Sequence, residues 1–242
     1  MASKWVHMFN KLNRDVSLKI HYVLDQWVPP FVRDCRMIMS FPLWLLFKHR
    51  YKAYLDFKET AFAMTEEEFR GFYRMVSDTA VERETDLNKA SIDKIIMHAT
   101  GPKILDVGCG RGFLAGMLSR DYEVSAVDIV IPHRLKEKFP SVQFYEHNVE
   151  MLPFADKTFD TVICTHTLEH VRNLHLTIKE LRRVGKKLII IVPKQRPYRY
   201  TFDLHLNFFP YRYSLLSVMG KVKDEVVCED IDSDIFYMET TT

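Results

Sequence analysis

The sequence has few of the residues that mark specialised protein classes. Its 242 residues include only eight glycines, four cysteines and three tryptophans, while 47% are apolar and 27% are charged. This composition excludes a collagen, a disulfide-stapled miniprotein and a disordered chain. The cysteines are far apart and form no C-x-x-C pair, so we expect a reduced, cytoplasmic protein.

A long hydrophobic run is also missing. The longest uncharged apolar stretch near the N-terminus, Met37 to Phe47, is shorter than the ~20 residues that span a bilayer. Charges are spread through the first twenty residues, so no signal peptide is expected. The net charge of +2 gives no general attraction to nucleic acid, and we expect no nucleic-acid partner.

Charge is unevenly distributed along the chain. Residues 1–58 contain ten Lys and Arg against four Asp, together with many Trp, Phe and Met side chains. A basic, aromatic segment can make peripheral contact with an anionic membrane surface. The plainer interpretation, which we favour, is that residues 1–100 form a helical extension that caps the substrate side of a main domain over residues 101–242.

Strand–helix alternation begins at Lys103. Continuous Val, Ile and Leu runs are typical of strands that are buried on both faces of a parallel sheet. Helical patterns separate several of them, which predicts an α/β fold with a doubly wound, seven-stranded, mostly parallel sheet. Two late runs are expected to complete it as an antiparallel edge pair. The predicted strands are Ile104–Val107, Val124–Val127, Val142–Tyr145, Thr161–Cys164, Leu188–Val192, Glu225–Cys228 and Ile235–Met238.

A glycine-rich loop follows the first predicted strand. Asp106-Val107-Gly108-Cys109-Gly110-Arg111-Gly112 leads directly into a helix, so a ligand can approach backbone that has no Cβ in the way. Doubly wound sheets bind ligands at this carboxyl edge. Asp128 ends the second strand, where its carboxylate can accept both hydroxyls of a ribose. The two features together predict a nucleoside site.

Two other nucleotide loops do not fit. A dinucleotide-binding loop reads G-x-G-x-x-G, but here the third glycine comes one residue early, at Gly112. No G-K-[ST] sequence follows, which excludes a triphosphate-binding loop.

The sequence here resembles class I S-adenosylmethionine (SAM) dependent methyltransferases of the small-molecule, ubiquinone-pathway-like branch. The resemblance runs from about Lys103 to Val192 and implies a Rossmann-like methyltransferase fold with SAM as cofactor. It implies that the glycine loop wraps the methionine end and the ribose, that Asp128 binds the ribose, and that the residues after strands two and three flank the adenine. The cofactor-binding residues implied are Asp106, Gly108, Cys109, Gly110, Gly112, Asp128, Ile129, Asn148, Val149 and Thr165.

The segment after the fourth strand reads Thr165-His166-Thr167-Leu168-Glu169-His170 and should face the transferred methyl group. The resemblance suggests His166 and His170 as catalytic residues, serving as base or substrate contact. In ubiquinone-pathway O-methyltransferases and in methyltransferases acting on RNA 3′ ends, a related E-x-x-E-H run binds a divalent metal. A metal on His166, Glu169, His170 and His205 is therefore also possible here, although His166 replaces the first Glu.

The same part of the sequence also allows other interpretations. H-x-x-E-H also spells an inverted zinc-peptidase motif, but that motif needs the middle of a helix rather than a strand end. Cys109 and Cys164 have no neighbouring base and are expected to be small buried apolar residues. The loop from Pro193 to Phe209 carries three cations among aromatic residues, which suits a phosphate or sugar acid, or a solvated loop equally well.

The substrate class stays open at this level. We expect O-methylation of a small molecule, a sugar or glycan, or a lipid-linked intermediate. The alternatives are a SAM-binding partner protein without catalysis, or a metal-dependent methyltransferase for RNA ends.

Overall fold

The computed structural model describes residues 22–23, 27–77, 84–200, 203–220 and 226–241. The chain divides into two compact units: an N-terminal unit of residues 1–83 and 195–206, and a sheet unit of residues 84–194 and 207–242. The boundary expected near residue 100 stays a prediction. In the observed division, residues 84–100 belong with the sheet and residues 195–206 with the N-terminal helices.

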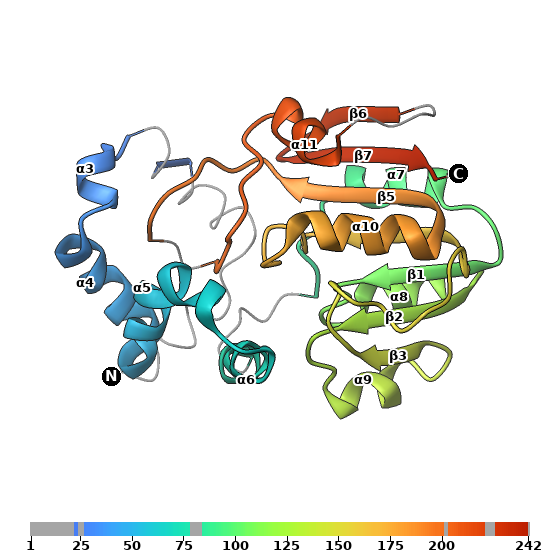
Figure 1. The fold of residues 1–242 in the computed structure, drawn as a ribbon, viewed down its shortest axis with the longest axis horizontal. Helices are drawn as coiled ribbons and strands as arrows, with labels where there is room; N and C mark the ends of the chain where they lie inside the picture. Colours follow the sequence, from blue (N-terminus) through green and yellow to red (C-terminus); the bar gives the residue numbers. More distant parts are fainter. Residues whose placement is uncertain (1–21, 24–26, 78–83, 201–202, 221–225, 242) are drawn as a thin grey trace. The chain divides into compact units, whose positions relative to one another are not determined.

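The sheet unit is built on a seven-stranded sheet in the order β3-β2-β1-β4-β5-β7-β6 (Figure 1). The first five strands are parallel to one another, and each forms where the sequence has an apolar run. β7 pairs antiparallel with both β5 and β6. The strands are β1 (Lys103–Val107), β2 (Glu123–Asp128), β3 (Gln143–Glu146), β4 (Phe159–Thr165), β5 (Gly185–Pro193), β6 (Val226–Ile231) and β7 (Asp234–Thr240).

The predicted doubly wound sheet is therefore confirmed. The two late runs do pair antiparallel, but β7 lies inside the sheet between β5 and β6, and only β6 forms the edge. β7 is buried over most of its length, because it pairs with a strand along each edge and its alternate side chains pack into the clusters on the two faces of the sheet.

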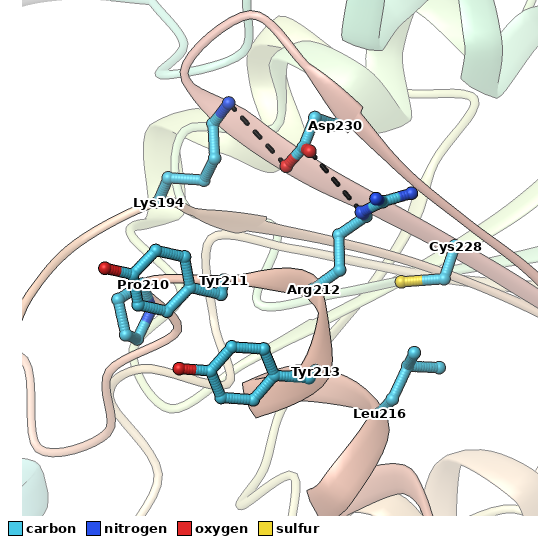
Figure 2. Close-up of a pocket in the computed structure, with 8 residues that line it drawn as sticks. All are labelled: Lys194, Pro210, Tyr211, Arg212, Tyr213, Leu216, Cys228 and Asp230. Atoms are coloured by element: carbon cyan, nitrogen blue, oxygen red, sulfur yellow. Dashed lines mark ion pairs between the residues drawn. The ribbon is translucent and has the colours of Figure 1, made fainter.

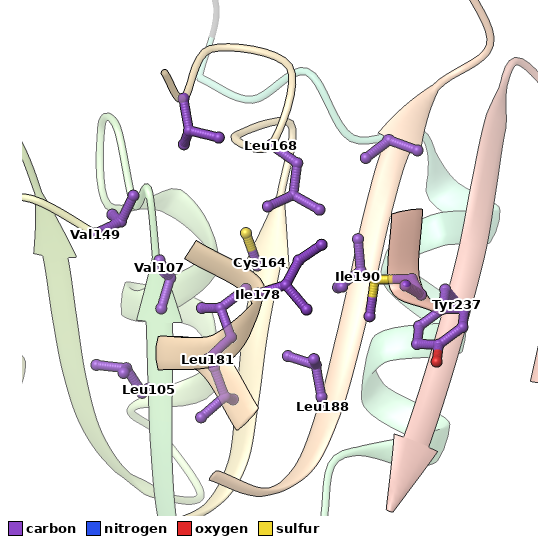
Figure 3. Packing of buried hydrophobic residues seen from close by; sticks show 14 of the residues in the cluster. Leu105, Val107, Val149, Cys164, Leu168, Ile178, Leu181, Leu188, Ile190 and Tyr237 are labelled. Atoms are coloured by element: carbon purple, nitrogen blue, oxygen red, sulfur yellow. The ribbon is translucent and has the colours of Figure 1, made fainter. Parts of the chain in front are cut away.

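Helices cover both faces of the sheet. On one face, the apolar sides of α10 (Leu174–Val184) and α11 (Arg212–Met219) pack on alternate strand residues, as the cluster in Figure 3 shows. On the other face, α7 (Lys89–His98), α8 (Phe113–Leu118) and α9 (His133–Lys138) contribute to a second cluster. Burying apolar surface on both faces stabilises the strands and fixes the positions of the loops at their carboxyl ends.

The N-terminal unit is helical, in agreement with the expected extension. Its described elements are α3 (Pro30–Arg33), α4 (Arg36–Phe47), η1 (Lys48–Arg50), α5 (Tyr51–Thr60), η2 (Ala61–Ala63) and α6 (Glu66–Ser77). Residues 1–21, part of the expected membrane-contact segment, lie outside the described residues. None of the described helices is long and apolar enough to span a membrane.

Aromatic stacking holds these helices together. Phe57 of α5 is buried and stacks on Phe69 and Phe72 of α6, with ring centroids 6.2 and 4.6 Å apart. α6 begins with a capping box in which the Thr65 N–H donates to Glu68 Oε2 at 2.8 Å, and the Glu68 N–H donates to Thr65 Oγ1 at 3.2 Å.

Residues 195–206 belong to this unit through specific contacts. Lys58 donates to the carbonyl of Tyr198 at 2.7 Å. Burial lowers the pKa of the Lys58 ammonium group to about 8, although the charges of Asp203 and Asp34 act to raise it. Arg199 pairs with Glu59 at 2.6 Å. At least one cation of the predicted substrate loop is therefore engaged in holding the loop itself.

Candidate functional site

The glycine loop connects β1 to α8 and has the backbone that the sequence predicts. Gly108 and Gly110 have φ values of 72° and 51°, in the left-handed region that favours glycine. A Cβ at Gly108 would lie 1.9 Å from the Thr167 hydroxyl, whereas a Cβ at Gly110 would have no neighbour within 4 Å. Gly108 is therefore required for close packing, while Gly110 faces open space where a ligand can approach.

Asp128 lies at the carboxyl end of β2 and organises the loop. Its Oδ2 accepts the N–H of Gly110 at 2.8 Å, and its Oδ1 accepts the N–H of Val130 at 3.4 Å. Burial raises the pKa of Asp128, and these backbone N–H groups with the nearby His170 partly offset the effect. The carboxylate thus lies directly against the glycine loop, in the place predicted for a ribose acceptor.

Asp106 adds a second buried carboxyl to the same site. Its side chain is 1% exposed, and burial together with the charge of Asp128 raises its pKa to about 7, although the Ala115 N–H opposes the shift. Among the described residues, Asp106 Oδ2 has no hydrogen-bond partner. Two neighbouring carboxyls with one unsatisfied oxygen favour a ligand that brings a positive charge or a donor.

The remaining predicted cofactor contacts follow the same edge of the sheet. Ile129 comes directly after β2, and Asn148 and Val149 follow β3. Asn148 Oδ1 accepts the Glu150 N–H at 2.9 Å, and Val149 packs into the core. Thr165 ends β4. The fold thus brings the ends of four strands together, as the predicted nucleoside site requires.

Cys109 and Cys164 are buried, as expected for small apolar residues, and all four cysteines are free thiols. Burial raises the pKa of both thiols, and the charges of nearby carboxylates raise it further. Neither sulfur is therefore suited to act as a nucleophile at neutral pH.

His166 follows β4 in an unusual environment. Its φ is 48°, a left-handed conformation that is uncommon outside glycine, and its N–H donates to the Ile191 carbonyl at 2.9 Å. Its Nδ1 lies 3.5 Å from Glu169 Oε1 and its Nε2 lies 3.6 Å from Asp234 Oδ2. The imidazole is therefore held between two carboxylates.

This geometry determines the charge of the ring. Burial alone would lower the pKa of His166, but interactions with Asp234 and Glu169 outweigh it and raise the pKa to about 10. With these two carboxylates beside it, the ring is protonated on both nitrogens at neutral pH. The assignments of His166 as a catalytic residue and as a metal ligand stay predictions.

Asp234 is a site residue that the sequence analysis missed. It is fully buried at the start of β7, where Asn88 donates to it at 2.9 Å and Ser91 at 3.1 Å. It reaches His166 because β7 pairs with β5, so that Asp234 lies opposite Pro193. No sequence pattern signals this contact, since the two residues come from distant parts of the chain.

Two further predicted metal ligands, His170 and His205, lie in different units. His170, in the sheet unit, is partly buried, and its N–H donates to the Thr167 carbonyl at 2.9 Å. His205, in the N-terminal unit, contacts Gln195 Oε1 through Nδ1 and lies 3.4 Å from Asp203 Oδ2. The predicted divalent metal on these residues therefore stays a prediction.

A hollow of about 590 Å³ lies beyond the end of β5, at the N-terminal end of α11 (Figure 2). Tyr211 and Tyr213 stack at its rim with ring centroids 5.2 Å apart. Asp230 lies 3.7 Å from the Lys194 ammonium and 3.4 Å from Arg212 Nε. Two cations therefore share one carboxylate here, apart from the residues of the glycine loop.

Comparison with known proteins finds relatives over the part of the chain that contains these residues. A family model described as a methyltransferase domain matches residues 105–191, which include the glycine loop, Asp128 and the end of β4. The chain is 33% identical over 95 residues to a ubiquinone biosynthesis O-methyltransferase of Paracidovorax citrulli, covering 36% of this chain and 40% of that protein. Residues 105–191 therefore match a methyltransferase domain.

Longer but weaker similarities extend beyond this domain. A ubiquinone/menaquinone biosynthesis C-methyltransferase of Idiomarina loihiensis is 28% identical over 154 residues, which is 58% of this chain and 59% of that protein. A solved structure of a Pyrococcus horikoshii protein shares the fold, with a TM-score of 0.50 at 19% identity, covering 73% of this chain and 92% of that one. The chain spans about two fifths of the Paracidovorax protein, so the matched region is the methyltransferase domain alone.

The residues of the methyltransferase domain fit SAM. The ribose of SAM offers hydroxyl donors to Asp128. The ammonium and sulfonium groups of SAM carry the positive charge that the paired carboxyls favour. Gly110 leaves room for it beside the loop, since even an added Cβ would have no neighbour within 4 Å. The unsatisfied Oδ2 of Asp106 is the atom that a bound donor would complete.

Proposed function

We propose that this chain is a SAM-dependent methyltransferase that methylates a small or lipid-linked acceptor at oxygen. The observation that carries the proposal is the pair of buried carboxyls, Asp106 and Asp128, against the left-handed glycine loop. A protein that had no use for a cationic nucleoside would gain stability by replacing them, because both are desolvated.

In this proposal Asp128 binds the ribose hydroxyls, and Asn148 with Ile129 borders the adenine. SAM supplies a methyl group activated on a sulfonium, which departs as a neutral thioether when the acceptor oxygen forms the new bond. The domain needs no covalent chemistry of its own. It holds the acceptor in line with the methyl group and excludes water.

A hydroxyl acceptor must also lose its proton, and we assign its acceptance to His170 rather than His166. His166 is already protonated between Glu169 and Asp234, so it acts as a fixed positive charge that positions Glu169. His170 lies four residues further along the chain, near Asp128. No metal is used in this proposal.

The acceptor class is inferred from the relatives. Proteins named as ubiquinone O-methyltransferases and as ubiquinone/menaquinone C-methyltransferases both match the domain, so transfer to either oxygen or carbon has a precedent among them. A binding protein without catalysis is the alternative, and it would retain SAM affinity with no transfer.

The test is to incubate the protein with methyl-labelled SAM and fractionated cell extract, and to follow the label into a chromatographic product. We expect one labelled small-molecule fraction with wild-type protein. Asp128→Ala should strongly reduce the label, whereas the exposed Asp121→Ala should retain it. SAM binding without any labelled product in any fraction would contradict the enzymatic proposal and favour the binding protein.

A further inference from the structure

α4 in the N-terminal unit exposes an unusually apolar face. Five of its large apolar side chains are exposed to solvent by 44–85%: Met37, Ile38, Phe41, Trp44 and Leu45. The helix has a single charged residue, Arg36, at its start. Surface helices of globular proteins normally place charged and polar residues on the outward face. The outward face of α4 is apolar instead, which favours contact with an apolar partner over contact with water.

The exposed side chains form one continuous stripe. At 3.6 residues per turn, Met37, Phe41 and Trp44 fall within about 60° of one another around the helix axis, and Ile38 and Leu45 widen the stripe to about 120°. The buried residues Met39 and Leu43 lie on the opposite side. Contacts with α5 therefore satisfy one face of α4, and the stripe is a second apolar face.

Aromatic and basic side chains border the stripe. Trp27 and Phe31, just before it in the chain, are exposed by 74% and 78%. At its other end the Lys48 ammonium lies over the Trp44 ring, 5.0 Å from the centroid. His49 and Lys52 follow and are exposed. The border therefore combines tryptophan, phenylalanine and positive charge.

This combination identifies the partner. Trp residues concentrate at membrane–water interfaces, and interfacial helices carry apolar side chains on one face with Lys and Arg beside it. α4 has twelve residues, fewer than the ~20 needed to span a bilayer, so it would lie in the plane of the surface. A groove on another protein would also suit the apolar stripe. Such a groove would not explain the positive charge at the border of the stripe.

We infer that residues 27–52 dock this protein on an anionic lipid bilayer, with the α4 stripe inserted among the headgroups and acyl chains. Lys48 and Lys52 reach the headgroup phosphates, and Trp44 anchors the interface. The inference does not depend on SAM binding or on methyl transfer. It develops the membrane interpretation of the basic N-terminal segment.

The test uses the full chain and sedimentation with vesicles of phosphatidylcholine alone or with about a third phosphatidylglycerol. We expect binding to the anionic vesicles that weakens as salt is raised, because the surface attraction is screened within a Debye length. The double variant Phe41→Asp/Trp44→Asp should bind at least tenfold more weakly. The control Met97→Asp/Met151→Asp removes two exposed apolar side chains from the sheet unit and should bind as wild type.

Lys48→Glu/Lys52→Glu separates the two contributions, since it should weaken binding to anionic vesicles and leave the folded state unchanged by circular dichroism. If Phe41→Asp/Trp44→Asp does not fold, the milder Met37→Ser/Phe41→Ser takes its place. If the wild-type protein sediments with neither vesicle type, the inference is overturned. A wild-type dimer in light scattering that the stripe variant converts to a monomer also overturns it, because a second copy of the chain would then cover the stripe.

Discussion

Replacing Asp106 with Asn should stabilise the ligand-free protein and at the same time weaken SAM binding. Asp106 is fully desolvated, and its pKa in the folded protein is about 7, against an ordinary value of 3.8. Asn keeps the shape and an acceptor oxygen for the Ala115 N–H, but it never ionises. The substitution therefore isolates the cost of a buried negative charge.

The sign of the pH dependence follows from the proton count. Between pH 3.8 and 7 the folded state holds a proton on Asp106 that the unfolded state has lost, so stability from this group falls as pH rises through that window. Above pH 7 the full cost applies, about 4 kcal/mol for a displacement of about three pKa units. At pH 5 the cost is only about 1.5 kcal/mol by the same relation.

Thermal unfolding of the ligand-free variant and wild type at both pH values measures this difference. The gain in Tm from Asp106→Asn should be larger at pH 8 than at pH 5 by about 5–10 °C, for a stability difference of about 2–3 kcal/mol. The exposed Asp121→Asn serves as the control and should show no such difference. SAM binding to Asp106→Asn should weaken by about tenfold or more, the value of a lost charged hydrogen bond.

A stabilisation that is equal at the two pH values would refute the reasoning, because it would show that Asp106 is not the titrating group. A variant that is less stable than wild type at pH 8 would refute it as well. In that case the carboxylate must have a compensating partner in the folded protein.

Three further predictions concern the same site. Asp128→Ala should weaken SAM binding by about 10- to 100-fold with the fold intact, measured by calorimetry, while Asp121→Ala should bind normally; equal affinities would remove the ribose assignment. Gly108→Ala should lower the free energy of unfolding by about 2–4 kcal/mol, because its Cβ would strike Thr167, whereas Gly110→Ala should cost about 1 kcal/mol; urea titration giving the same loss for both would contradict the packing argument. EDTA should leave methyl transfer unchanged, and activity restored only by a divalent cation would show that a metal is used.

The fold could be largely predicted because the strands are continuous apolar runs. α10 occupies Leu174–Val184, where the apolar residues repeat at helical spacing and Asn173 caps the helix. The position of β7 could not be predicted, because two adjacent runs of similar composition do not show which of them pairs with β5.

The site was predictable to the extent that its residues are close in sequence. The glycine loop and Asp128 follow directly from the ends of two strands. The charge state of His166 was not predictable, since it depends on Asp234, which β7 brings beside it from 68 positions further along the chain. The assignment of residues 195–206 to the N-terminal unit also depends on distant contacts, chiefly those of Lys58 and Arg199.

The most direct test of the whole account is calorimetric titration of the purified chain with S-adenosylhomocysteine, the demethylated form of the cofactor. The site should bind one molecule per chain, with a dissociation constant on the order of micromolar to tenths of millimolar, the usual range for enzyme substrates. The same compound should raise the unfolding temperature. No heat of binding and no thermal shift at about millimolar ligand would contradict the claim that the glycine loop, Asp106 and Asp128 form a nucleoside site.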